Sequence, residues 1–299
     1  MEINRLDVRY PLPRADLRGH EEGKIPGKRP RPWLVLSDFE INEHDIFVCV
    51  EITHAGGRSH RDYLVDGITV CPSDRFDSGP HFVDAQQLWT FALDSDQTSR
   101  NVATLEATSE RTALPRVLAK LARRLSVPST PPVSEPRLAV GNVVWIELLA
   151  TDDMRESDLL ALQTELAELA GVRWPYRSTR LPCVIVATAA HERELNPHVL
   201  ALVSVVPLVD CPRLRELRPD YPTVSAPDSS IDFSILTQLV LTVDYRNVPC
   251  RREGDKVIES PRRVYFDDGD VKSWMVDDKV RDWTLRKVRQ HLGVRTNDR

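Results

Sequence analysis

The sequence predicts a mainly β protein with helices (α+β), built as two small β-barrels in tandem, each closed by a C-terminal helix. Short apolar runs of strand length are numerous, and an amphipathic helical pattern follows each of two groups of strands. The chain also has 22 prolines against 12 glycines. Because proline is excluded from helix interiors and central strands, this composition favours short strands joined by loops.

The first half contains five extended segments followed by a helix. The helix, expected over residues 114–125, carries leucines and a valine on one face and cations on the other. The cations in its last turn suit the negative end of the helix dipole. The expected strands are Asp7–Tyr10, 33–36, Ile46–Thr53, 62–70 and 82–92.

A proline-rich segment, residues 128–139, predicts a linker between a first barrel (1–127) and a second barrel (140–299). The second half also carries two insertions. Leucines at helical spacing predict a helix over 154–172, and four prolines predict a long surface loop over 210–232. The strands expected in this half are 141–148, 184–186, 199–206 and 236–243, and a terminal helix is expected over 276–292.

The second half contains a weaker copy of residues 31–53, about 150 residues further along the chain. The copy keeps two apolar strands but has Leu181 where the first half has Arg31. Where the first half has Thr53, the copy has Val203 or Ser204, depending on the offset used. These similarities predict an internal duplication in which one repeat keeps a polar pair and the other has lost it.

Composition limits the classes of function. A net charge of −5 disfavours broad binding to a polyanion, although cations concentrate locally within residues 14–31. The five cysteines form no CxxC pair, and no set of metal ligands is evident, so we expect neither a metal nor another cofactor. The sequence shows no signal peptide and no membrane-length apolar run, which predicts a cytoplasmic protein without a membrane partner.

The chain resembles the MazF/PemK family of toxin ribonucleases, whose SH3-like barrel is similar to that of the gyrase poison CcdB. The resemblance rests on Arg31-Pro32 before an apolar strand and on Ile52-Thr53 at the end of the next strand. Three further features add to the resemblance: the opening strand Asp7–Tyr10, a later strand that contains glutamine, and the closing helix. The resemblance covers most of residues 7–127 and, more loosely, 140–294.

The resemblance implies a hydrolase of a toxin–antitoxin type that cleaves single-stranded RNA without a metal. The ribose 2′-hydroxyl is the nucleophile in that family, and the implied products are a 2′,3′-cyclic phosphate and a 5′-hydroxyl. Carried over, the catalytic residues are Arg31 and Thr53. The resemblance also implies an antitoxin protein as a partner, besides the RNA.

The chemistry is consistent with these residue types. Attack by a 2′-hydroxyl builds negative charge on the phosphorane oxygens, and a guanidinium offers paired donors to two of them. A preorganised donor of this kind contributes roughly 3–4 kcal/mol to lowering the barrier. Arginine is a poor general base. Among the nearby candidates His54, His60 and Glu51, we expect His54 to be the base because its reference pKa suits the role best.

Four further residues are expected to contact the RNA because they border the catalytic pair in the sequence: Lys28, Arg29, Arg58 and His60. The second repeat is expected to be non-catalytic and to complete the site, so that one chain imitates the family's homodimer. The alternative is a non-catalytic PemK/CcdB-like module that binds a protein or regulates one. The acidic net charge, the inserted helix and the degenerate second repeat favour that alternative.

Overall fold

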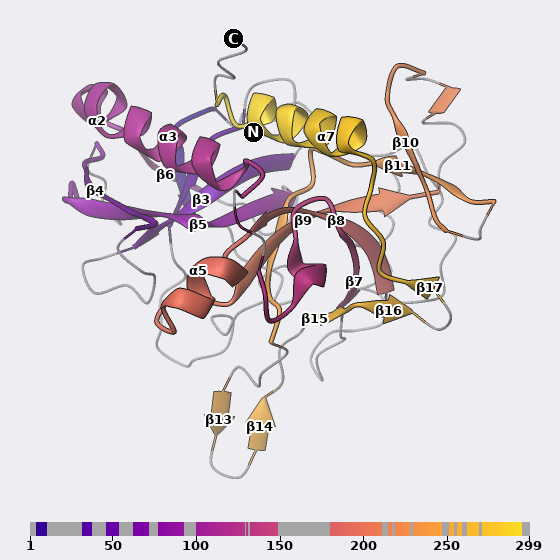
Figure 1. Ribbon diagram of the computed structural model, residues 1–299. Helices are drawn as coiled ribbons and strands as arrows, with labels where there is room; N and C mark the ends of the chain where they lie inside the picture. Colours follow the sequence, from indigo (N-terminus) through magenta and orange to yellow (C-terminus); the bar gives the residue numbers. More distant parts are fainter. Residues whose placement is uncertain are drawn as a thin grey trace.

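The chain folds into two antiparallel β-sheets, with its longer helices along one side of the molecule (Figure 1). No helix among the residues described is long and apolar enough to cross a membrane. This computed structural model describes residues 4–10, 32–37, 46–53, 62–71, 77–92, 100–128, 130, 132–148, 180–210, 215–216, 219–227, 230–246, 251–253, 256–258, 262–268 and 271–294.

The first sheet has six strands in the order β4-β5-β3-β2-β1-β6. Helices α2 (Ala107–Thr112) and α3 (Leu114–Arg124) follow it. A proline in the first turn of α3 and arginines in its last turn both suit a helix, and its apolar face joins the protein core. The strands are Asp7–Tyr10 (β1), Trp33–Val35 (β2), Ile46–Thr53 (β3), Leu64–Ile68 (β4), His81–Ala92 (β5) and Arg100–Thr104 (β6).

The second sheet has the order β10-β11-β9-β8-β7-β15, and β12 also pairs with β9, so that the sheet curls as a half-barrel (Figure 1). Its strands are Val143–Leu148 (β7), Arg180–Thr188 (β8), Leu202–Val209 (β9), Thr223–Ser225 (β10), Asp232–Ile235 (β11), Leu241–Asp244 (β12) and Arg262–Tyr265 (β15).

Among its described residues, the second half also contains a 3₁₀ helix, two α-helices and two small hairpins. The helices are η1 (Pro136–Leu138), α5 (Ala190–Leu195) and α7 (Asp278–His291). The hairpins pair β13 (Arg251–Glu253) with β14 (Lys256–Ile258), and β16 (Asp267–Asp268) with β17 (Val271–Lys272).

The predicted class, mainly β with helices, is confirmed, and most predicted strands are present. The helix predicted over 114–125 is α3, and the terminal helix is α7. Of the strand predicted over 236–243, only residues 241–243 form a strand, β12. Residues 236–240 are an interruption between β11, which ends at Ile235, and β12. Strand β6 was missed because its sequence has few apolar residues. The helix predicted over 154–172 lies outside the residues described.

The predicted surface loop over 210–232 contains strand β10, so this prediction was wrong in part. Strand β10 lies at the edge of the second sheet, where it pairs only with β11. Two prolines flank it, Pro222 and Pro227. Prolines at the ends of a short edge strand remove no hydrogen bond from the sheet interior, so a proline-rich sequence is compatible with a strand here.

The two sheets share a strand order and local geometry. Each begins after a residue with positive φ, 70° at Leu6 and 92° at Gly141. The Leu6 N–H donates to the Val35 carbonyl at 2.9 Å, and the Gly141 N–H donates to the Ile185 carbonyl at 2.8 Å. Val35 and Ile185 therefore hold matching positions, and the ladders on either side allow the two sheets to be compared residue by residue.

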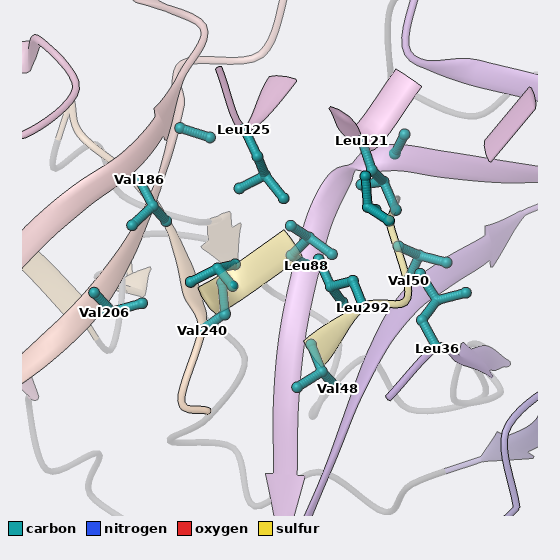
Figure 2. Close-up of a cluster of buried hydrophobic side chains, with 14 of the residues drawn as sticks. Leu36, Val48, Val50, Leu88, Leu121, Leu125, Val186, Val206, Val240 and Leu292 are labelled. Carbon is teal, nitrogen blue, oxygen red and sulfur yellow. The ribbon is translucent and has the colours of Figure 1, made fainter. Parts of the chain in front are cut away.

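One hydrophobic cluster contains side chains from both sheets and from the helices above them (Figure 2). Leu88 of β5 lies near its middle, between Val50 of the first sheet and Val240, the residue before β12 of the second. Leu121 of α3 and Leu292, which follows α7, complete this region, and all five side chains are almost fully buried. The two sheets therefore share a core.

Strands β5 and β12 meet through reciprocal hydrogen bonds at two threonines. The Thr90 N–H donates to the Val240 carbonyl at 3.0 Å, and the Val240 N–H donates to Thr90 Oγ1 at 2.8 Å. In turn, the Thr242 hydroxyl donates to the Leu88 carbonyl at 2.8 Å, and the Leu88 N–H donates to Thr242 Oγ1 at 3.2 Å. We call this contact between β5 and β12 the joint.

Candidate functional site

Thr53 is the one residue of the predicted site that the structure describes. It is the last residue of β3, it is 9% exposed, and it pairs with Phe82 on β5. Its partner in the predicted catalytic pair, Arg31, lies outside the described residues. So do the predicted base His54 and the four predicted RNA contacts: Lys28, Arg29, Arg58 and His60.

The entry to β2 lies beside the end of β3. The Ile52 N–H donates to the Pro32 carbonyl at 2.8 Å, so the backbone at Pro32 is within one hydrogen bond of the residue that precedes Thr53. Strands β2 and β3 continue this contact as an antiparallel ladder, in which Trp33 pairs with Glu51. The start of β2 and the end of β3 therefore lie side by side at the same end of the sheet.

Charged side chains form a row across the middle of the first sheet. Arg9 of β1 pairs with Trp33 of β2, Trp33 pairs with Glu51 of β3, and Glu51 pairs with Asp84 of β5. Directly paired residues project to the same face, so these four side chains share one face. Thr53 also lies on it, two residues beyond Glu51. We call Arg9, Glu51 and Asp84, together with Trp33 between the first two, the charged row.

The charged row is buried, and its described contacts hold it in place. Arg9 is 0% exposed and Glu51 and Asp84 are 3% and 2% exposed. The Arg9 guanidinium donates to Asp7 Oδ2 at 2.8 Å. Asp84 accepts from the Gln86 N–H at 2.9 Å and from the side chain of Gln87. Buried charges are costly unless they are paired, which indicates a specific reason for keeping them here.

The second sheet has an apolar row at the matching positions. Since Ile185 matches Val35, Cys183 matches Trp33. Cys183 pairs with Val144 on one side and Pro207 on the other. The Leu236 N–H then donates to the Pro207 carbonyl at 3.0 Å, which places Leu236 opposite Pro207 as Asp84 lies opposite Glu51. The charged row thus exists in the first sheet and is replaced by Val144, Cys183, Pro207 and Leu236 in the second.

The ladders also correct the position that matches Thr53. Val50 pairs with Leu34 on β2, and Val206 pairs with Val184 on β8. Three residues further along lies Thr53 in β3 and Val209 in β9. The predicted counterparts, Val203 and Ser204, were wrong because the hairpin between β8 and β9 is longer than the one between β2 and β3. The second sheet still lacks the hydroxyl at this position.

A second group of polar side chains lies near the joint. Arg124, at the end of α3, is 8% exposed, and burial lowers its pKa to about 10. Nearby, burial and the charge of Glu192 raise the pKa of Tyr63 to about 12. Arg124 donates to the Ala85 carbonyl at 3.1 Å and to Ser204 Oγ at 2.8 Å, so it links the two sheets.

The described polar side chains are suited to orienting a bound molecule and to stabilising charge. Within the part of the chain that the structure describes, no group of three or more His, Cys, Asp or Glu side chains is arranged to hold a metal ion. The charged row places fixed charges on β3, which ends at Thr53, and on its neighbouring strands. Glu51 was among the residues predicted from the sequence, whereas Arg9 and Asp84 were not. Their signal was a charge at a strand position whose neighbours are apolar.

No protein-family model and no curated protein matches this chain. The chain is similar to a solved structure named "Endoribonuclease from Mycobacterial species". The two are 18% identical, with a TM-score of 0.26, and the match covers 41% of this chain and 90% of that chain. At this TM-score the likeness carries no argument about activity, which has to rest on the geometry of the site.

Proposed function

We propose that this chain is a metal-independent endoribonuclease toxin of a toxin–antitoxin type, with one active and one degenerate repeat. It cleaves single-stranded RNA by attack of the ribose 2′-hydroxyl, and Arg31 and Thr53 are its catalytic residues. The observation that carries the proposal is the asymmetry between the sheets. The first keeps a charged row and Thr53, whereas the second has apolar residues at all the matching positions.

The backbone contact at Pro32 supports the pairing of Arg31 with Thr53. Arg31 precedes Pro32 by one peptide bond, and the Pro32 carbonyl accepts from the Ile52 N–H next to Thr53. An arginine side chain is long enough to reach across such a distance between neighbouring strands. In this proposal the guanidinium neutralises the phosphorane oxygens, and the Thr53 hydroxyl donates one further hydrogen bond.

The matching strand order and the reciprocal bonds at the joint support an internal duplication. In a symmetric dimer, the same surface of each subunit meets its own copy, so that contacts occur in reciprocal pairs. The Val240 N–H donating to Thr90 Oγ1 and the Leu88 N–H donating to Thr242 Oγ1 are such a pair within one chain. We propose that the chain is a pseudo-dimer, in which the second repeat supports the site formed on the first.

The remaining site residues complete the proposal. His54 is the base, and Lys28, Arg29, Arg58 and His60 contact the RNA backbone, with a small antitoxin protein as the cellular partner. Phosphate contacts made by cations weaken as salt rises because counterions are released on binding. RNA affinity should therefore fall with ionic strength, and it should fall less steeply in a Lys28→Ala, Arg29→Ala variant.

The test is cleavage of a fluorescent single-stranded RNA by the purified full chain in EDTA. The wild type should cleave it, and Arg31→Ala should reduce the rate by about 100-fold or more. A matched control is Arg180→Ala, since Arg180 lies next to Leu181, the position that matches Arg31 in the second half. Equal cleavage by the wild type and Arg31→Ala would remove the proposed mechanism.

A second candidate is a non-catalytic module of the same fold that binds or regulates a protein. The burial of the charged row favours it, because Arg9, Glu51 and Asp84 are at most 3% exposed and cannot themselves touch an RNA. Under this alternative the wild type neither cleaves nor binds RNA at low salt. Binding without cleavage would instead place the chain among regulators that keep the RNA surface and have lost the chemistry.

A further inference from the structure

The two threonines of the joint have unlike neighbours, although each accepts a backbone N–H from across the joint. Thr242 pairs with Ser204 on β9, and the two hydroxyl oxygens are 2.7 Å apart. Thr90 pairs with Val48 on β3, at the position that matches Ser204. The joint therefore has a hydroxyl beside Thr242 and an apolar side chain beside Thr90, whose own hydroxyl donates to the Gln238 carbonyl at 3.2 Å.

The hydroxyl at Ser204 completes a chain of hydrogen bonds that begins at a charged group. The Thr242 hydroxyl donates to the Leu88 carbonyl, so the Ser204 hydroxyl must donate to Thr242 Oγ1. Ser204 Oγ then accepts from the Arg124 guanidinium at 2.8 Å. Each of the two hydroxyl protons has one acceptor, and the bonds run from the first half into the second and back again.

This chain of bonds is buried. Arg124 is 8% exposed, Ser204 is 0% and Thr242 is 2%. A buried donor that loses its acceptor costs the full free energy of removing it from water, and the cost is larger for a charged group. The second terminal amino group of Arg124 donates to the Ala85 carbonyl within its own half. Ser204 is therefore the acceptor that the other half supplies.

We propose that Arg124, Ser204 and Thr242 form a pairing lock, which makes the two unlike halves of the chain bind each other in preference to like halves of two copies. In a pair of two first halves, Val48 would take the place of Ser204. The guanidinium of Arg124 would then face methyl groups. Specificity arises from this penalty on the wrong pair as well as from the bonds of the right one. The inference concerns assembly and does not depend on nuclease activity.

The test uses the full chain with a protease site inserted in residues 128–131, cut after folding. Native mass spectrometry follows the exchange of halves between labelled and unlabelled copies. The cut wild type should remain as one first half bound to one second half, with no pairs of like halves. Ser204→Val should speed exchange by about 10- to 100-fold, because it leaves the guanidinium without its acceptor. Ser204→Thr should restore slow exchange.

Two further variants separate the lock from a general loss of packing. Thr90→Val removes the equivalent hydroxyl on the other side of the joint but affects no charge, so it should have a smaller effect than Ser204→Val. Arg124→Met with Ser204→Val should exchange more slowly than Ser204→Val alone, since the stranded charge is gone. Exchange in Ser204→Val as slow as in the wild type, or no recovery in the double variant, would overturn the proposal.

Discussion

Arg9 and Asp7 lie two residues apart on β1, with the guanidinium donating to the carboxylate at 2.8 Å in the buried interior of the first sheet. The second sheet has Asn142 and Val144 at these positions, since Gly141 matches Leu6. The two sheets therefore differ at both members of the ion pair. A buried charge is costly without its counter-charge, so the presence of both charges in one sheet and of neither in the other is physically consistent.

Asp7→Asn should therefore destabilise the protein by about 3 kcal/mol, because it removes the counter-charge of a buried guanidinium. Urea unfolding measures this change. Asp7→Asn with Arg9→Val reproduces the pair found in the second sheet, and it should recover part of the lost stability. If the double variant lost more stability than the two single substitutions lose in sum, the result would contradict the ion-pair account.

Leu88→Ala should destabilise the whole chain in one transition. Leu88 is 0% exposed and lies in the core between Val50 and Val240. Removing such a side chain costs about 2–5 kcal/mol through lost burial and the cavity that remains. Val133→Ala is the control, because Val133 is 80% exposed. Separate unfolding of the two halves in the Leu88→Ala variant would show that they do not share a core.

Glu194 should make the contact between helix α5 and the predicted linker sensitive to acid, because it binds Val133 and Ser134 of that linker. The side-chain hydroxyl and N–H of Ser134 and the N–H of Val133 donate to its carboxylate and lower its pKa to about 2. A depressed carboxylate pKa stabilises the fold above the ordinary value of 4.5, and this stabilisation is lost as the pH falls from there toward 2.

The measurement for this contact is the chemical shift of the Ser134 amide followed by NMR as the pH is lowered. In the wild type the shift should move with a midpoint near 2, and in Glu194→Gln that transition should be absent. Glu192→Gln, on the same helix, should leave it unchanged. A midpoint near 4.5 in the wild type would mean that the three donors do not stabilise the carboxylate.

Sequence patterns predicted the elements whose apolar residues are continuous or strictly periodic. Strand β3 and helix α3 are examples, since an apolar run and a 3.6-residue period each indicate one structure. Strand β10 was missed because its three residues show only a weak strand pattern, whereas the neighbouring prolines are a strong loop signal. The interruption at residues 236–240 also has no local signal. Its residues contact β5 across the joint, which only the tertiary structure brings together.

The same physical reason applies to the candidate site, whose residues stay a prediction. The position of Thr53 at the end of a strand could be predicted because the apolar run before it is clear. The burial of Arg9 and Asp84 could not, because a charged residue in a strand is usually assigned to the exposed face. The counterpart of Thr53 was placed wrongly because one constant offset does not hold when hairpins differ in length. The register of the hydrogen-bonded strands places Val209 at that position. Register is a property of paired strands and cannot be read from the sequence of one strand.

The most direct test of the central claim is to identify the ends of the RNA products formed in EDTA by the full chain. We predict 2′,3′-cyclic phosphate and 5′-hydroxyl ends by mass spectrometry, because the attacking oxygen is the neighbouring ribose hydroxyl. Product should fall sharply in Thr53→Val and stay unchanged in Val209→Thr, the matching position of the second sheet. Products with 5′-phosphate ends, or equal cleavage by the wild type and Thr53→Val, would contradict the account.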